Sequence, residues 1–108
     1  MLYLVIGVPK GAAPPADVAS LEEGVATLTT LVEWERSGKA KVAGVFSGKN
    51  GLAFVLDVAN HTDLHLCVAA LPPFSQLDWD VTPMIAAAED LEIAKGALER
   101  YRAAAAAG

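Results

Sequence analysis

Two aspartates flank a tryptophan in the stretch LPPFSQLDWDVTPM, residues 71–84. Side chains alternate between the two sides of a β-strand, so Asp78 and Asp80 would project together, opposite Trp79. A carboxylate that apolar neighbours remove from water can act as a general base. The alternative is an edge strand whose polar side meets solvent and whose charges discourage pairing with another strand.

Two histidines, His61 and His65, have the spacing of two metal ligands on one helix. Asp63 lies between them in the sequence but would point away from the side that the histidines share. No third ligand lies nearby in the sequence. We therefore expect a pair of histidines on a helix surface, and no bound metal.

Cys67 is the only cysteine, so the chain cannot form an internal disulfide. It lies in the apolar run HLCVAAL without a basic neighbour, which favours a buried thiol over a nucleophile. The sequence also has no glycine-rich phosphate loop, no metal-binding Cys/His cluster and no serine triad signature. We therefore expect no cofactor.

The composition is that of a globular chain, with 108 residues of which 54% are hydrophobic and 19% are charged. A net charge of -5 argues against nucleic acid and against an anionic membrane surface as partners. The apolar opening LYLVIGV lacks a preceding basic region, which favours a strand over a signal peptide. No run approaches the roughly 20 apolar residues that cross a bilayer. We expect one cytoplasmic domain over residues 1–108, with an alanine-rich tail over 102–108 that frays.

The first half of the chain has a simple predicted organisation. Its hydrophobic pattern predicts a strand over residues 2–8, and prolines and a glycine predict a loop over 9–17. A helix begins at Asp17 or Ser20, which are both suitable N-caps, and ends at Gly38. This helix has an apolar stripe with steps of three and four, and its acidic residues lie off that stripe, where we expect solvent. The stripe is Val18, Leu21, Val25, Leu28 and Val32, and the acidic residues are Glu22, Glu23, Glu33 and Glu35.

The second half begins with a predicted strand over 40–47, a hairpin signal at Asn50-Gly51 and another strand over 52–58. Asn60 is a suitable cap for a short helix over 61–71. Residues 76–82 alternate as a strand does, and Thr82-Pro83 predicts the start of a last helix. The stripe of that helix is Ile85, Ala88, Leu91, Ala94 or Lys95, Leu98 and Tyr101.

The order β-α-β-β-α-β plus a C-terminal helix predicts an α+β fold of the ferredoxin-like class. Its antiparallel four-stranded sheet has the first and third strands at the centre. Both helices of this motif cover the same face of the sheet. Strands 2–8 and 52–58 are apolar on both faces, so the uncovered face would carry large apolar side chains into water. We therefore expect a homo-oligomer, a dimer or a multiple of dimers, that pairs through this open face.

Residues 36–58, RSGKAKVAGVFSGKNGLAFVLDV, and 65–81, HLCVAALPPFSQLDWDV, carry motifs that resemble the muconolactone isomerase family. In that family a helix ending in R-x-G leads into a hairpin and a strand ending in Phe-Asp-Val. A Leu-His pair, L-P-x-F and a strand of the form Asp-Ile-Glu-Val follow, and Asp80 stands here for the Glu. The other matching residues are Arg36, Gly38, Gly48, Val55, Asp57, Val58, Leu64, His65, Leu71, Pro72, Phe74, Asp78 and Val81. The resemblance implies ferredoxin-like subunits that pair into a dimeric α+β barrel.

The resemblance also implies a cofactor-free isomerase that moves a proton on a small anionic lactone. Asp80 or Asp78 would be the base, and Lys41 would hold the anion. The other implied substrate-binding positions are His65 and, on the open face of the first and third strands, Leu4, Ile6, Leu52 and Phe54. All but His65 are apolar where family members carry polar side chains, and Val45 replaces a family arginine. Two functions remain open, an isomerase for a small lactone or enol-type metabolite and a non-catalytic oligomeric binder of an apolar small molecule.

Overall fold

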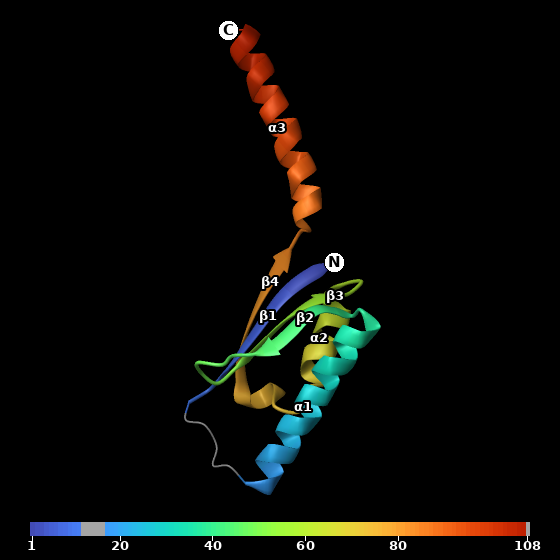
Figure 1. The fold of residues 1–108 in the computed structure, drawn as a ribbon, viewed down its shortest axis with the longest axis vertical. Coiled ribbons are helices and arrows are strands. Elements are labelled where there is room, and N and C mark those ends of the chain that lie inside the picture. The colour runs from blue at the N-terminus through green and yellow to red at the C-terminus, as the bar shows by residue number, and fades with distance from the viewer. Residues whose placement is uncertain (12–16, 108) are drawn as a thin grey trace.

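The computed structural model describes residues 1–11 and 17–107, so most of the loop expected over 9–17 lies outside the described residues. The elements follow the order β-α-β-β-α-β with a C-terminal helix, as predicted (Figure 1). They are β1 (Leu2–Pro9), α1 (Val18–Ser37), β2 (Ala40–Val45), β3 (Leu52–Asp57), α2 (His61–Ala69), the short 3-10 helix η1 (Phe74–Gln76), β4 (Leu77–Met84) and α3 (Ala87–Ala107).

The four strands form one sheet in the order β2-β3-β1-β4, with every neighbouring pair antiparallel. The apolar strands β1 and β3 are therefore central, as the ferredoxin-like prediction requires. Leu4 pairs with Val55 on one side, and Ile6 pairs with Asp80 on the other. The register of β2 shifts between Ala40 and Val42, so Lys41 is the extra residue of a bulge.

Local capping signals fix the ends of the two helices that cover the sheet. The Asp17 carboxylate accepts a 2.8 Å hydrogen bond from the Ser20 N–H, so Asp17 and not Ser20 is the N-cap of α1. Gly38 ends α1 with φ at 82°, a left-handed conformation that glycine adopts without strain. Asn60 caps α2 by accepting a 2.9 Å bond from the Asp63 N–H. These three caps confirm the sequence prediction.

The predicted start of the last helix is wrong. Thr82 and Pro83 continue β4, where they pair with Leu4 and Tyr3 of β1, and α3 begins only at Ala87. The reason is that β4 lies at the edge of the sheet, where proline is tolerated because it need not donate to a second neighbour. The alanine-rich tail continues α3 through Ala107.

The core lies between one face of the sheet and the helices α1 and α2. Tyr3 and Val5 of β1 face it together with Leu52, Phe54 and Leu56 of β3, and all five are buried. The Phe54 ring contacts the Trp34 ring of α1 edge-on, with ring centroids 5.4 Å apart. The expectation that Leu52 and Phe54 line the open face is therefore wrong. The alternation of β3 places Ala53 and Val55 on that face instead.

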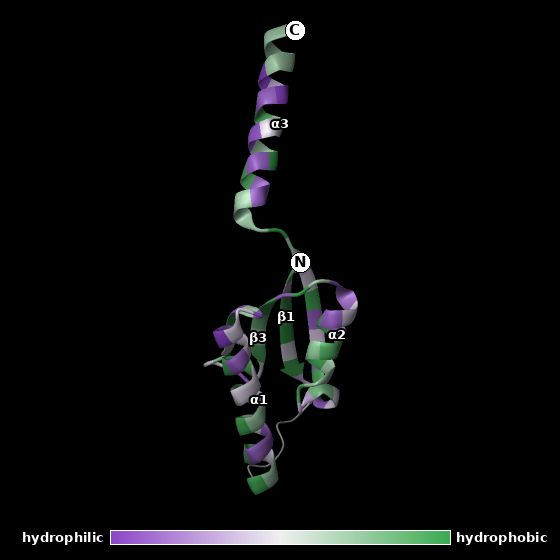
Figure 2. Cartoon of the chain, turned by 90° about the vertical axis from the view of Figure 1, so that its right-hand side faces the viewer, coloured by the Kyte–Doolittle hydropathy of each residue, from purple (hydrophilic) through white to green (hydrophobic). Residues whose placement is uncertain are grey.

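Helix α1 turns a different side to the sheet from the one that its apolar stripe suggests. Its buried residues are Thr27, Leu31 and Trp34, and the large Trp34 and Leu31 side chains fill the space above β3. The stripe from Val18 to Val32 faces away, with exposed fractions between 45% and 72%. In Figure 2 several turns of α1 are coloured as hydrophobic, including those near its lower end. The packed side of α1 is thus less apolar than its free side.

Helix α3 extends away from the sheet and gives the chain a length of 70 Å against widths of 28 and 23 Å (Figure 1). It has no buried residue. Its apolar residues Leu91, Leu98 and Tyr101 are exposed. Among the described residues, no helix combines the length and the apolar character that crossing a membrane requires.

Candidate functional site

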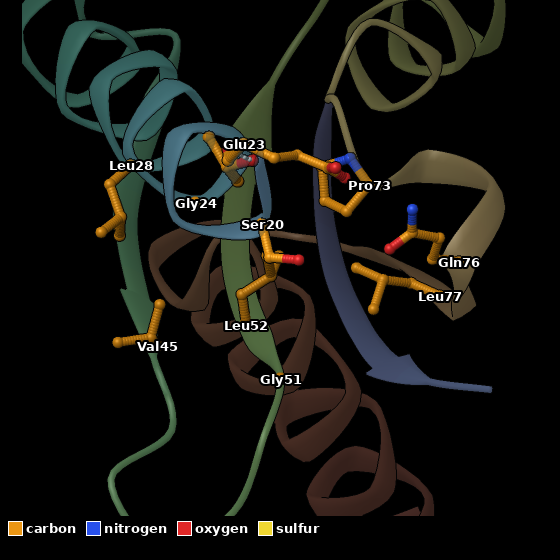
Figure 3. A pocket seen from close by; sticks show the side chains of 11 residues that line it. Ser20, Glu23, Gly24, Leu28, Val45, Gly51, Leu52, Pro73, Gln76 and Leu77 are labelled. Carbon is orange, nitrogen blue, oxygen red and sulfur yellow. Dashed lines mark hydrogen bonds between the residues drawn. The ribbon is translucent and has the colours of Figure 1, made fainter. Parts of the chain in front are cut away.

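A pocket of about 330 Å³ opens on the helix-covered side of the sheet, next to the first turns of α1 (Figure 3). Its walls come from α1, from the ends of β2 and β3 where their hairpin begins, and from η1 and the start of β4. The lining residues are Ser20, Glu23, Gly24, Thr27, Leu28, Val45, Gly51, Leu52, Pro73, Gln76 and Leu77. This volume lies at the lower end of the range for small-molecule sites.

Glu23 is the one acidic residue among the described residues that line this pocket. Its side chain runs from α1 toward Pro73 (Figure 3). The carboxylate atom Oε1 is buried and has no hydrogen-bond partner within the described part of the chain. A buried acceptor without a partner costs stability, and a role in binding or catalysis is one reason for a protein to keep such an atom. A ligand that donates a proton or a hydrogen bond would satisfy Oε1.

The rest of the lining combines an apolar wall with a few polar groups. Leu28, Val45, Leu52 and Leu77 form the wall, and Gln76 supplies an amide at the rim. The Thr27 hydroxyl donates a 2.9 Å hydrogen bond to the Glu23 carbonyl and so ties down the turn that carries the carboxylate. No lysine or arginine is among the described lining residues. This arrangement suits a small neutral molecule with an acidic C–H or O–H group.

Sequence reasoning missed this site because it placed Glu23 on the solvated side of α1. The stripe from Val18 to Val32 dominates the hydrophobic pattern and hides the inward side. Glu23, Thr27, Leu31 and Trp34 follow one another at steps of four, four and three, which also put residues on one helix face. A carboxylate in line with a tryptophan and a leucine is the signal that could have identified the inward face.

The structure places Asp78 and Asp80 on the open face of the sheet, as predicted, opposite Val8 and Ile6 of β1. Both aspartates are exposed in the single chain. Lys41 lies in β2, at the opposite edge of the sheet. Three strand spacings, about 14 Å, separate the two edge strands. Within one chain, Lys41 therefore does not approach either aspartate.

Lys41 instead pairs with Asp57 at the end of β3. The Lys41 Nζ lies 3.7 Å from the Asp57 carboxylate, and the amino group of Met1 lies 3.1 Å from it. The hydrogen bond from the Met1 amino group, followed by its charge and that of Lys41, lowers the pKa of Asp57 below its ordinary value. All three groups are exposed, so these ion pairs contribute little to stability. They border a hollow of about 640 Å³ between the end of the sheet and the start of α3, which also includes Glu89.

The two histidines have different partners. The Tyr3 hydroxyl and His61 Nδ1 are 2.8 Å apart, so a core tyrosine holds the ring at the start of α2. His65 is exposed, and its ring meets that of Phe74 edge-on with centroids 6.3 Å apart. No group of three metal-ligating side chains occurs in residues 1–11 and 17–107. Cys67 is half-buried against the core.

The open face also has a shallow apolar hollow of about 250 Å³ over β2 and β3. Leu4 and Val55 of the central strands and Val42 of the edge strand border it. Among the predicted substrate-binding residues, Leu4 and Ile6 thus share the open face with the aspartates. Leu52 belongs to the helix-side pocket, and Phe54 is buried in the core. The predicted site residues are therefore divided between the two sides of the sheet.

The sheet order and the helix arrangement define the chain as an α+β protein of the ferredoxin-like class. Its structure is similar to the crystal structure of muconolactone isomerase, with a TM-score of 0.70 and 20% identity over 80% of this chain and 90% of that one. It is also similar to 5-chloro-2-hydroxyhydroquinone dehydrochlorinase from Burkholderia phenoliruptrix AC1100 in complex with 2,5-dihydroxybenzoquinone. That match has a TM-score of 0.64 and 16% identity over 82% of this chain and 98% of that one. No protein-family model and no curated protein matches the chain. The chain has a muconolactone isomerase-like fold.

Proposed function

We propose that the chain is a cofactor-free enzyme that moves a proton on a small lactone or enol-type molecule, with Glu23 as the base. The observation that carries the proposal is the Glu23 Oε1 atom, which is buried and unpartnered within the described residues and belongs to a residue that lines the pocket. Glu23 would remove a proton from a carbon next to a carbonyl group and return it to another carbon of the same molecule. No electrons are gained or lost, so the reaction needs no redox partner. The two similar structures, an isomerase and a dehydrochlorinase, agree with small-molecule chemistry on this fold.

The lining favours a neutral substrate over the anionic one that the family resemblance implies. A carboxylate substrate needs a cation to hold it, and the described lining offers none. The Gln76 amide is available at the rim to donate a hydrogen bond to a carbonyl oxygen. The apolar wall of Leu28, Val45 and Leu52 offers an uncharged surface for the rest of such a substrate.

Asp80, or its neighbour Asp78, is the competing base. Both share the open face with Leu4 and Ile6, and a second copy packed on that face would remove them from water. Such a dimer, paired through the open sheets, is also part of the proposal, because Leu4, Ile6 and Val55 remain only half-buried in the single chain. In that arrangement Lys41 would help to hold an anionic substrate.

Solvent deuterium exchange tests the two bases without knowledge of the natural substrate. A panel of neutral lactones and enolisable ketones is incubated with the protein in deuterium oxide, and exchange at carbon is followed by NMR. We expect Glu23→Gln to slow the exchange by about 10²-fold or more, the usual scale for a lost general base. We expect the matched changes Asp80→Asn and Asp78→Asn, and the removal of the cation by Lys41→Met, to leave the rate nearly unchanged.

Thermal stability gives a second readout that does not depend on activity. Glu23→Leu removes a buried acceptor without a partner, so we expect it to raise the melting temperature while it abolishes exchange.

Two outcomes would contradict Glu23 as the base. Loss of exchange in Asp80→Asn but not in Glu23→Gln would assign the base to the open face. If the wild type exchanges no substrate but apolar ligands raise its melting temperature, the protein is a binder, which the apolar hollow beside Leu4 and Val55 favours.

A further inference from the structure

Two helices of the chain carry apolar seams that nothing in the described chain covers. On α1 the seam is the apolar stripe already described, Val18, Leu21, Val25, Leu28 and Val32, in which valine and leucine alternate at steps of three and four. On α3 the seam is Ala87, Leu91, Ala94, Leu98 and Tyr101, with steps of four and three. The large members of both seams are 45% to 78% exposed. Alternating steps of three and four are the pattern of helices that pair side by side in a coiled coil.

Helix α3 buries none of its residues against the described part of the chain. It has 21 residues, none of them buried, and it points away from the sheet (Figure 1). An isolated helix of this length is only marginally stable in water, because most helix stability in proteins comes from packing an apolar face. We therefore expect the seam of α3 to pack against an apolar surface with the same spacing. The seam of α1 has that spacing and nearly the same length.

The α3 helix of the same chain cannot reach that surface. Only Ile85 and Ala86 join β4 to α3, and two extended residues span about 7 Å. The seam of α1 faces away from the sheet, beyond the full width of a helix of about 10–12 Å. Figure 1 shows α3 continuing in the direction of β4 instead of turning back. The helix that covers α1 must come from another molecule.

We infer that α3 of a second copy of this chain packs antiparallel along the free side of α1. With the helices antiparallel, five layers form in one register and use both seams completely. Val18 meets Tyr101 of the second copy, and Leu21 meets Leu98. The following layers pair Val25 with Ala94, Leu28 with Leu91, and Val32 with Ala87. From Leu21 to Val32 the layers alternate between a pair of leucines and a valine that faces an alanine, and the last layer pairs Val18 with the large Tyr101 side chain.

The charges beside the seams favour the antiparallel direction. In this register Glu22, next to Leu21, lies close to Lys95 of the second copy, so opposite charges meet. A parallel pairing of the same seams would place Glu22 next to Asp90, which has the same charge. Both Glu22 and Lys95 are exposed in the single chain and can form the new pair.

A two-fold axis makes this contact occur twice. In one chain α1 and α3 both run toward the same end of the molecule (Figure 1), and they follow each other along its long axis (Figure 2). A rotation of 180° across that axis places each α3 beside the α1 of the other copy, antiparallel, and closes the dimer. This contact leaves the open sheet face free, so the two modes of association can combine into larger oligomers.

Cysteine crosslinking separates this pairing from its rivals. In a Cys67→Ala background, Val25→Cys and Ala94→Cys are made in separate chains that carry tags of different size. The two chains are mixed, allowed to exchange subunits and oxidised. We expect a disulfide between the two different chains, and none when either chain is oxidised alone. Ala103→Cys, on the opposite side of α3, replaces Ala94→Cys as the matched control and should not crosslink.

Each other outcome overturns the inference. Crosslinking of Val25→Cys alone would show that α1 pairs with α1, and crosslinking of Ala94→Cys alone would show that α3 pairs with α3. No crosslink in any mixture would show that the seams stay apart.

Light scattering adds an independent readout, since Leu98→Glu should lower the oligomer mass by half or more. The control Ala103→Glu should not change the mass. Because α3 lies outside the core, Leu98→Glu should leave the sheet folded, which the near-ultraviolet spectrum of Trp34 and Trp79 reports.

Discussion

The two sides of the sheet differ in what covers them. The helix-covered side holds a closed aromatic and aliphatic core, and the pocket with Glu23 lies at its edge. The open side carries similar apolar residues, Leu4, Ile6 and Val55, but only half-buried, beside the exposed Asp78 and Asp80. The core beneath α1 and α2 is thus closed within a single chain, whereas Asp78 and Asp80 leave water only if a second molecule covers the open side. Changes on the first side should therefore affect folding, and changes on the second should affect assembly.

The largest expected effect comes from placing a charge on each side of the same strand. Phe54 is 1% exposed and packs between Trp34 and Trp79, so Phe54→Asp buries a charge without a partner. We expect a loss of several kcal/mol and an unfolded chain. Val55→Asp should leave the chain folded but reduce the oligomer mass. Circular dichroism and light scattering of the two variants provide the measurement. A folded Phe54→Asp variant would contradict the assignment of the two faces.

A smaller effect is expected from adding one methyl group on each side. A Cβ on Gly7 would lie 2.7 Å from the Trp79 ring, which is held by a 3.0 Å hydrogen bond from its indole N–H to the Phe74 carbonyl. We therefore expect Gly7→Ala to cost about 1–3 kcal/mol, measured by urea unfolding. A Cβ on Gly44, which lies on the open face, would meet no other atom within 4 Å. Gly44→Ala should cost nothing or stabilise slightly by restricting the unfolded chain. Equal losses in both variants would show that the open side is as tightly packed as the core.

The smallest effect concerns the ion pairs of Asp57, where β3 ends. Its pKa is lowered in the folded chain by the Met1 amino group and then by Lys41. A lowered pKa contributes stability above the ordinary value of 3.8, and this contribution is lost as the pH falls through the folded value. Asp57→Asn should therefore lower the melting temperature slightly near neutral pH, and the difference should disappear in acid. High salt should reduce the same difference, because the carboxylate is exposed. A difference that persists in acid would exclude the ion pairs as its source.

Short-range signals explain why much of the fold could be predicted. Asp17, Gly38 and Asn60 act on the backbone within a few residues, so their types alone indicated where helices begin and end. The apolar runs of β1 and β3 indicated central strands because only buried strands are apolar on both faces. Thr82-Pro83 shows the limit. The same pair suits the start of a helix and an edge strand, and only the position of β4 in the sheet decides between them.

The site was harder to predict because periodicity shows which residues share a face but not which face points inward. The stripe of α1 is its most apolar side, yet the sheet receives Thr27, Leu31 and Trp34, whose volumes fit above Phe54. Glu23 lies on the same helix face as these three residues and therefore also points inward. On β3 the face assignment was off by one residue, so Phe54 was expected on the open face where Val55 in fact lies. Asp78 and Asp80 were placed on the correct face, because the apolar Leu77 and Trp79 alternate with them and identified the core side.

Leu28 belongs both to the wall of the Glu23 pocket and to the seam of α1. If a second copy covers that seam, the position of this one side chain depends on subunit association and on pocket occupancy together. Thermodynamic linkage then works in both directions, so a molecule that binds the pocket shifts the equilibrium between free and associated chains. The apparent affinity for such a molecule would change with protein concentration, and dilution alone would regulate the pocket.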